Sequence, residues 1–122
     1  MPFSDTRLTE NDKKTLRKNR SNRGLFVVIS GPQFGETFIV DKSQMIAGRS
    51  KGCSIIIDDA EVSKQHCIVY NDENAFFIED MESVNKTYIN KKHVKKRSRI
   101  HSGDRLILGN TVLKFLKEEI VE

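Results

Sequence analysis

The segments LFVVIS at residues 25–30 and ETFIV at residues 36–40, joined by GPQFG at residues 31–35, decide the fold class. Both segments are rich in β-branched and aromatic residues, which favour strands over helices. The glycines and proline between them favour a turn. The chain from Leu25 onwards is therefore predicted to begin as two short strands.

The same pattern continues to the end of the chain, where short apolar runs alternate with turn residues. Further strands are predicted at Gln44–Gly48, Ser54–Asp58, His66–Tyr70, Ala75–Glu79, Thr87–Ile89, Arg105–Leu108 and Thr111–Leu116. No stretch of residues 25–117 keeps the 3.6-residue period of an amphipathic helix. Many short strands at this spacing predict an all-β sandwich.

The first 24 residues differ from the rest in composition. They contain seven Lys or Arg and three Asp or Glu, so the formal net charge of +4 for all 122 residues lies in this segment. Segments with few large apolar residues cannot offset the entropy cost of ordering. The predicted organisation is a flexible basic tail at residues 1–24, one domain at 25–117, and the start of a linker to a further domain at 118–122.

Neither a metal site nor a cofactor is predicted. Cys53, His66 and Cys67 lack the spacing of a zinc site. The two cysteines are expected to be reduced, although spacing alone does not decide between thiols and a disulfide. No apolar run is long enough to cross a membrane, and the N-terminus lacks a signal peptide, so a cytoplasmic protein is expected.

Three polar clusters fall in the predicted loops. They are Gly48-Arg49-Ser50-Lys51-Gly52, Ser63-Lys64-Gln65-His66, and the stretch from Ser83 to Asn90. Their guanidinium, ammonium, hydroxyl and amide groups are hydrogen-bond donors suited to an anion, and the amide can also pair with a peptide backbone. A Ser63–His66 catalytic pair is not favoured, because no third group orients the imidazole. The expected protein is a binding module and not an enzyme.

The order of these motifs resembles the forkhead-associated (FHA) domain. The motifs are Gly48-Arg49, Ser63-Lys64-Gln65-His66, Asn85-Lys86-Thr87, Asn90, and the strand entry from Gly103 to Gly109. The resemblance covers roughly residues 25–116. It implies a sandwich of two twisted antiparallel sheets whose apical loops bind phosphothreonine peptides.

The resemblance also implies a role for each motif residue. Arg49, Ser63 and Lys64 would hold the phosphate, and Asn85 would pair with the peptide main chain. Gly48, His66, Thr87 and Asn90 would be structural. Additional contacts are expected from Ser50, Lys51, Val84 and Lys86.

Two positions depart from the family pattern. Val84 stands where many members have a hydroxyl residue, so one hydrogen bond to the phosphate is expected to be missing. Lys86 stands where the family usually has glycine, and a left-handed backbone there costs a non-glycine residue about 1 kcal/mol. The positive charge of Lys86 near the phosphate would compensate.

The expected partner is a phosphothreonine protein made by a Ser/Thr kinase, and the tail itself is a candidate. Phosphorylation at Thr9 would place Asp12 three residues later, a preference known in the family, although Glu61 opposes that aspartate. Thr6 is the competing site. In the family the chain termini lie away from the binding loops, so the tail would have to be nearly extended to reach the site of its own chain. Binding between two chains is therefore expected, giving phosphorylation-dependent dimers.

The sequence leaves three further functions open. By analogy with bacterial FHA proteins, the module would regulate a fused output domain such as a diguanylate cyclase. The alternative to phosphopeptide binding is nucleic-acid binding by the tail and the basic run Lys91–Arg99, which otherwise would be a solvated loop. That run lacks the interleaved aromatic residues that support single-strand binding. A pure oligomerisation domain is a third reading, opposed by Arg49, Ser63 and Asn85.

Overall fold

The structure is a computed structural model that describes residues 23–73 and 75–118, all in strands and loops. Short β-rich segments bounded by turn residues form strands, as their composition predicts. The strands are β1 Gly24–Ser30, β2 Thr37–Val40, β3 Gln44–Gly48, β4 Ile55–Ile56, β5 Cys67–Asp72, β6 Ala75–Asp80, β7 Thr87–Ile89, β8 Lys92–Val94, β9 Ser98–Ile100, β10 Arg105–Leu108 and β11 Thr111–Lys117. The prediction of an all-β sandwich is confirmed.

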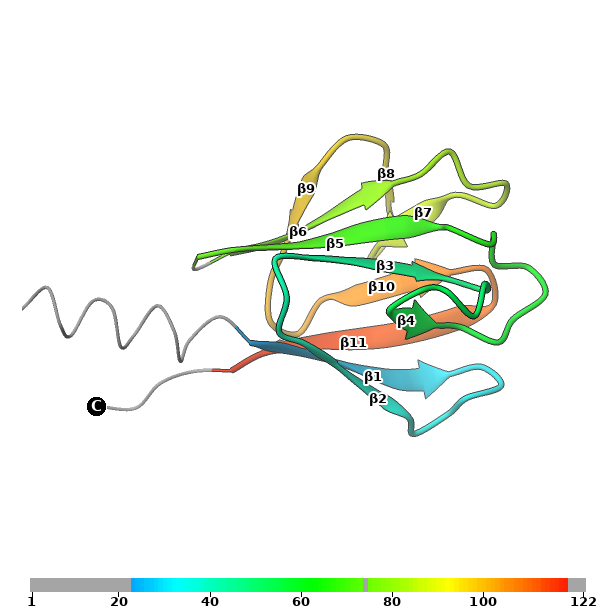
Figure 1. Ribbon diagram of the computed structural model, residues 1–122, viewed down its shortest axis with the longest axis horizontal. Helices are drawn as coiled ribbons and strands as arrows, with labels where there is room; N and C mark the ends of the chain where they lie inside the picture. The colour runs from blue at the N-terminus through cyan, green and yellow to red at the C-terminus, as the bar shows by residue number, and fades with distance from the viewer. Residues whose placement is uncertain (1–22, 74, 119–122) are drawn as a thin grey trace, which may run out of the picture.

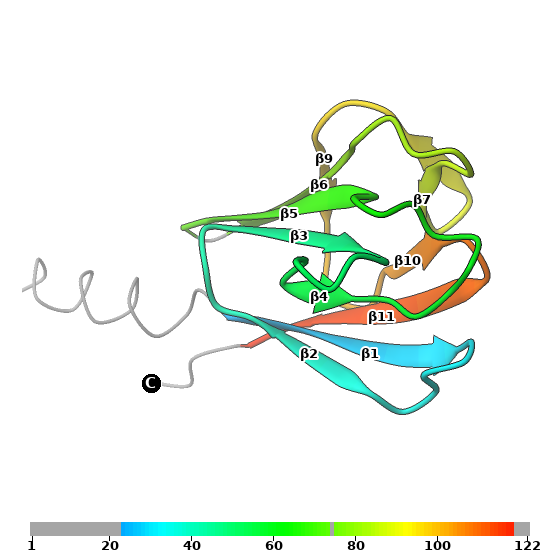
Figure 2. The same cartoon turned by 45° about the vertical axis from the view of Figure 1, so that its right-hand side comes forward.

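Two sheets form the sandwich (Figure 1). The first has the order β2-β1-β11-β10-β7-β8, and the second has the order β4-β3-β5-β6-β9. Neighbouring strands are antiparallel except β3 and β4, which run parallel. The turned view in Figure 2 separates the lower β1–β2–β11 layer from the β3–β5 layer above it.

The core lies between the inner faces of the sheets. Alternate residues of β1 are buried, as period-2 side-chain alternation requires. At the centre, the Phe115 ring lies 5.1 Å from the Phe26 ring and 4.9 Å from the Phe76 ring, centroid to centroid. All three rings are inaccessible to solvent or nearly so. They join β1 and β11 of the first sheet to β6 of the second.

The basic run at residues 91–99 differs from the solvated loop expected of it. It forms β8 and most of β9. Val94 and Ile100 are buried while the lysines and arginines around them are exposed. Each strand turns one apolar side chain inward, and the high density of charge hid that pattern in the sequence. The strand predicted at Ser54–Asp58 is shorter than expected, at two residues, whereas β5 extends to Asp72.

The two ends of the sandwich differ in what they carry. The chain enters β1 and leaves β11 at the left end in Figure 1. The loops after β3, after β4 and after β6 lie at the opposite end. Within residues 23–73 and 75–118, no helix has the length or apolar character to span a bilayer.

Candidate functional site

The first two predicted clusters meet through their backbones. The Arg49 N–H donates to the Ser63 carbonyl at 3.0 Å, and the Ser50 N–H donates to the Lys64 carbonyl at 3.1 Å. The Arg49 Nε also donates to the Val62 carbonyl at 3.0 Å. This last bond orients the guanidinium and leaves its two terminal amines for another acceptor. Arg49 and Ser63 are therefore held side by side, 14 positions apart in the sequence.

Gly48 allows this close approach of the two loops. A Cβ at position 48 would lie 2.2 Å from the Lys64 carbonyl oxygen. Real side chains do not tolerate such a distance to a backbone atom. Beside it, the buried Cys53 thiol donates to the same carbonyl at 3.1 Å. Both cysteines are free and buried, and burial raises the pKa of each thiol.

Ser63 joins the second cluster to the third. Its Oγ accepts a hydrogen bond from the Val84 N–H at 3.0 Å. The hydroxyl proton is not used in that contact, so Ser63 remains able to donate to an anion. Lys51, Lys64 and Lys86 are exposed on the loops around it. Val84 is also exposed, at 80%, and contributes only its backbone N–H to this arrangement.

His66 is fully buried beneath these loops. Its Nδ1 accepts from the Ser63 backbone N–H at 3.0 Å, so the neutral ring carries its proton on Nε2. Nε2 then donates to the Lys86 carbonyl at 2.7 Å. The imidazole therefore contacts the Ser63 backbone and not its hydroxyl. It connects two loops through their backbones, and it is not placed to take a proton from Ser63 Oγ as in a catalytic pair.

Lys86 has a left-handed backbone, with φ of 69°. This agrees with the expectation for a position where glycine is usual. The hydrogen bond from His66 to its carbonyl is one contact that holds this conformation. Lys86 lines a hollow of about 350 Å³ together with Asp80, Glu82, Ser83, His93 and Lys95. The start of the basic run therefore reaches the edge of the site.

Asn85 is oriented by Glu61. Its Nδ2 donates to the Glu61 carbonyl at 2.8 Å and to Glu61 Oε2 at 3.0 Å. Both amide protons are used, so the Asn85 Oδ1 is the group presented to a peptide N–H. The sequence indicated only that Glu61 adds negative charge near the site; its bond to Asn85 depends on two loops 24 positions apart.

Two aspartates that the sequence did not point to, the buried Asp59 and the partly buried Asp80, support these loops. Asp80 accepts from the Ser83 N–H at 3.1 Å and from Thr87 Oγ1 at 2.6 Å, which fixes the loop between β6 and β7. Asp59 accepts from the Glu61 N–H at 2.9 Å and from Thr111 Oγ1 at 2.8 Å. Thr87 and Thr111, which are fully buried, could have indicated these partners from the sequence. A hydroxyl in an apolar strand needs a hydrogen-bond partner when it is buried.

Burial alone would raise the pKa of each aspartate, but hydrogen bonds to the charged form outweigh it. The bonds from Ser83 and Thr87 lower the pKa of Asp80. The bonds to Asp59 from the Glu61 and Asn110 backbones and from the Thr111 hydroxyl lower its pKa as well. Both carboxylates are therefore stabilised as anions by the folded loops.

Asn90, predicted to be structural, lies outside the cluster formed by Arg49, Ser63 and Asn85. It has a left-handed backbone with φ of 57° at the turn between β7 and β8. Its amide donates to Asp104 at 3.2 Å and accepts from the Arg105 N–H at 3.0 Å. These bonds attach the turn to the start of β10.

The part of the chain that the structure describes has no group of three His, Cys, Asp or Glu residues arranged for a metal ion. The tail threonines Thr6 and Thr9 lie outside the described residues. The exposed basic run carries Arg97, whose guanidinium carbon lies 3.7 Å from the centre of the Tyr70 ring. Nucleic-acid binding by this run and the tail stays untested.

An arginine, a serine and an asparagine thus stand on three loops at one end of the β sandwich (Figure 1). The sequence model of the FHA domain matches residues 45–109. The chain belongs to the FHA family. FHA domains are phosphothreonine-dependent interaction modules, which is the class of function that the motifs implied.

Similar proteins extend this comparison. The chain is 32% identical over 94 residues to an oxoglutarate dehydrogenase inhibitor of Corynebacterium diphtheriae, covering 77% of this chain and 65% of that protein. It is 35% identical over 92 residues to the glycogen accumulation regulator GarA of Mycobacterium tuberculosis, covering 75% and 56%. The match thus spans less than two thirds of the length of these relatives.

Solved structures share the fold. The FHA domain of an Arabidopsis thaliana hypothetical protein superposes with a TM-score of 0.76 at 24% identity, covering 84% of this chain and 91% of that one. An FHA structure described in terms of phosphothreonine-dependent interactions gives a TM-score of 0.74 at 21% identity, covering 80% and 99%. At these identities the likeness concerns the fold.

Proposed function

We propose that this FHA domain binds phosphothreonine peptides, with Arg49, Ser63 and Lys64 on the phosphate and Asn85 on the peptide main chain. The observation that carries the proposal is the pairing of Arg49 with Ser63, whose backbones bond at 3.0 Å while the guanidinium and hydroxyl keep free donors. A phosphate of about −1.5 to −2 charge accepts several such bonds at once. The planar guanidinium of an arginine can donate two parallel hydrogen bonds to the phosphate, whereas the ammonium of a lysine acts as a point charge.

Arg49→Ala tests this site. Losing a charged hydrogen bond is expected to weaken phosphopeptide binding by about ten- to a hundred-fold, while the fold persists because Arg49 is exposed. Lys51→Ala, in the same exposed loop, is the matched control and is expected to have a smaller effect. Calorimetry with binders selected from a phosphothreonine peptide library gives the readout. Equal affinity of wild type and Arg49→Ala would exclude this site.

The finer proposal is that the ligand is the chain's own N-terminal tail, phosphorylated at Thr9 or Thr6 by a Ser/Thr kinase. About 15 residues separate Thr9 from β1, a span of at most ~50 Å when extended and typically ~20 Å as a coil. The domain is roughly 35 Å across. Because β1 begins at the end opposite the site loops (Figure 1), binding within one chain requires a nearly extended tail. Binding between two chains is favoured.

Light scattering distinguishes these outcomes. Protein phosphorylated at Thr6 or Thr9 is expected to dimerise, and Arg49→Ala is expected to keep the phosphorylated protein monomeric. Two monomeric phosphoforms, together with a phosphorylated tail peptide that does not bind the domain, would exclude the tail as ligand. Regulation of a fused output domain such as a diguanylate cyclase stays a prediction that the reading frame beyond Glu122 would test.

A further inference from the structure

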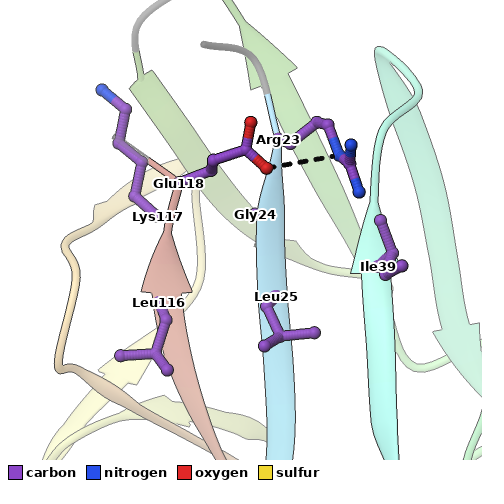
Figure 3. Close-up of a pocket in the computed structure, with 7 residues that line it drawn as sticks. All are labelled: Arg23, Gly24, Leu25, Ile39, Leu116, Lys117 and Glu118. Carbon is purple, nitrogen blue, oxygen red and sulfur yellow. Dashed lines mark ion pairs between the residues drawn. The ribbon is translucent and has the colours of Figure 1, made fainter. Parts of the chain in front are cut away.

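A small apolar groove lies on the outer face of the first sheet, at the end away from the site loops. Ile39 of β2, Leu25 of β1 and Leu116 of β11 form one row across three adjacent strands, because Leu25 pairs in register with both of the others. Ile39 is 50% exposed and Leu116 is 39% exposed. Figure 3 shows the three side chains along neighbouring strands. The groove encloses about 300 Å³.

The groove is bounded on both sides by polar residues. On one side the Arg23 Nε lies 3.6 Å from Glu118 Oε2, an ion pair drawn as a dashed line in Figure 3. On the other side, two residues along each strand, the exposed Thr37 and Lys114 flank the partly exposed Val27 of β1. An apolar row that is continuous with Val27 and has polar residues on the outer strands is typical of a surface that binds another segment.

We propose that the groove holds the chain's own N-terminal segment, with Leu16 as the inserted side chain. Residues 1–22 lie outside the described structure, and they join the fold at Arg23, which is itself part of the groove wall. A tethered segment acts at an effective concentration in the millimolar range. At such a concentration the burial of one leucine side chain populates the docked state in part, whereas the same contact made by a free peptide would be weak.

The sequence before Arg23 favours Leu16 over other apolar residues. Leu16 is the first large apolar residue upstream of the groove, and the intervening Asn19-Arg20-Ser21-Asn22 consists mainly of turn-forming residues. The seven residues from Leu16 to Arg23 reach at most ~25 Å, ample to reverse direction and return over adjacent strands. Leu8 requires a longer loop, whose closure costs more entropy.

Two other occupants fit the groove less well. Ile120 follows Glu118 by two residues, so the chain would have to reverse at a single residue to place it over Leu116. A second copy would meet the groove residues and Val27, a small apolar face, whereas stable interfaces bury about 800 Å² on each partner. The proposal is independent of phosphothreonine binding, since the groove and the site loops lie at opposite ends of the sandwich.

Methyl NMR of the full chain tests the assignment. Leu16→Ser is expected to shift the methyl resonances of Leu25, Ile39 and Leu116, while the matched variant Leu8→Ser leaves them unchanged. In the reverse direction, Ile39→Lys is expected to shift the Leu16 amide resonance. Thr37→Lys, on the same face of the same strand, is expected to leave it in place. Spectra are compared at several protein concentrations.

Three results would overturn the proposal. The first is that Leu16→Ser leaves the three methyl resonances unmoved. The second is that Leu8→Ser or Ile120→Ser moves them as much as Leu16→Ser does. The third is that the shifts disappear on dilution, which would show that a second copy occupies the groove. The unchanged fold of each variant is checked from the methyl resonances of the buried core, such as Leu106 and Leu113.

Discussion

Both amide protons of Asn85 are donated to Glu61, one to its carbonyl and one to its carboxylate. The residue proposed to bind the peptide backbone is therefore oriented by an acid at the edge of the proposed phosphate site. Glu61 is exposed, so its charge also acts on any ligand that passes Asn85. An acidic ligand residue there is disfavoured, and a basic one is favoured.

Glu61→Gln isolates this charge effect, because glutamine retains an oxygen that accepts from Asn85. A tail peptide phosphorylated at Thr9, which carries Asp12, is expected to bind Glu61→Gln about two- to five-fold more tightly than wild type, the size of an exposed charge interaction. Titration calorimetry measures the change. The gain should vanish when the peptide carries Asp12→Ala; a gain that persists would mean that Glu61 does not act on that aspartate.

Gly48→Ala is expected to disrupt the site through its backbone. The added Cβ would lie 2.2 Å from the Lys64 carbonyl oxygen, so the Arg49 and Ser63 loops must separate. We expect phosphopeptide affinity to fall at least ten-fold and the thermal midpoint to drop. Gly52→Ala is the matched control, since its nearest neighbour would be 3.8 Å away. Similar behaviour of the two variants would show that the loop contact is not required.

His66→Ala is expected to lower stability first and binding second. It removes the acceptor for the Ser63 N–H and the donor to the Lys86 carbonyl, and leaving such part-buried groups unpaired costs up to about 1–3 kcal/mol each. A loss of this size lowers the melting temperature by several degrees in a domain of this length. His101→Ala, at an exposed position, should leave it unchanged. Normal stability with lost binding would instead make His66 a ligand contact.

Acid is expected to destabilise the site loops. The pKa values of Asp59 and Asp80 are lowered below the ordinary 3.8, so their stabilising contribution is complete above that value and is lost as the pH falls through the folded-state pKa. Melting temperatures measured from pH 6 down to pH 2 should decline below about pH 4. In Asp80→Asn the melting temperature should fall less steeply with decreasing pH than in the wild type. In Asp41→Asn, at an exposed position, it should fall as in the wild type. A parallel decline in Asp80→Asn would refute this role for Asp80.

Much of the fold was predictable because it depends on local chemistry. Period-2 alternation and turn residues predicted β1, β3, β7 and β10 to within a residue. The strands β8 and β9 were missed, because two buried side chains among seven charged or polar neighbours give a weak local signal. Only pairing with β7 and β6 makes them strands.

The sequence by itself determined that this is a β sandwich carrying the FHA motifs, because strand propensity, turn chemistry and motif order are properties of short segments. Tertiary structure alone decided how the motif residues are held. The bracing of Ser63 and Lys86 by His66, the orientation of Asn85 by Glu61, and the support of the loops by Asp59 and Asp80 each join residues from different segments. Buried polar groups must find partners, and which partner each one finds depends on how the chain packs.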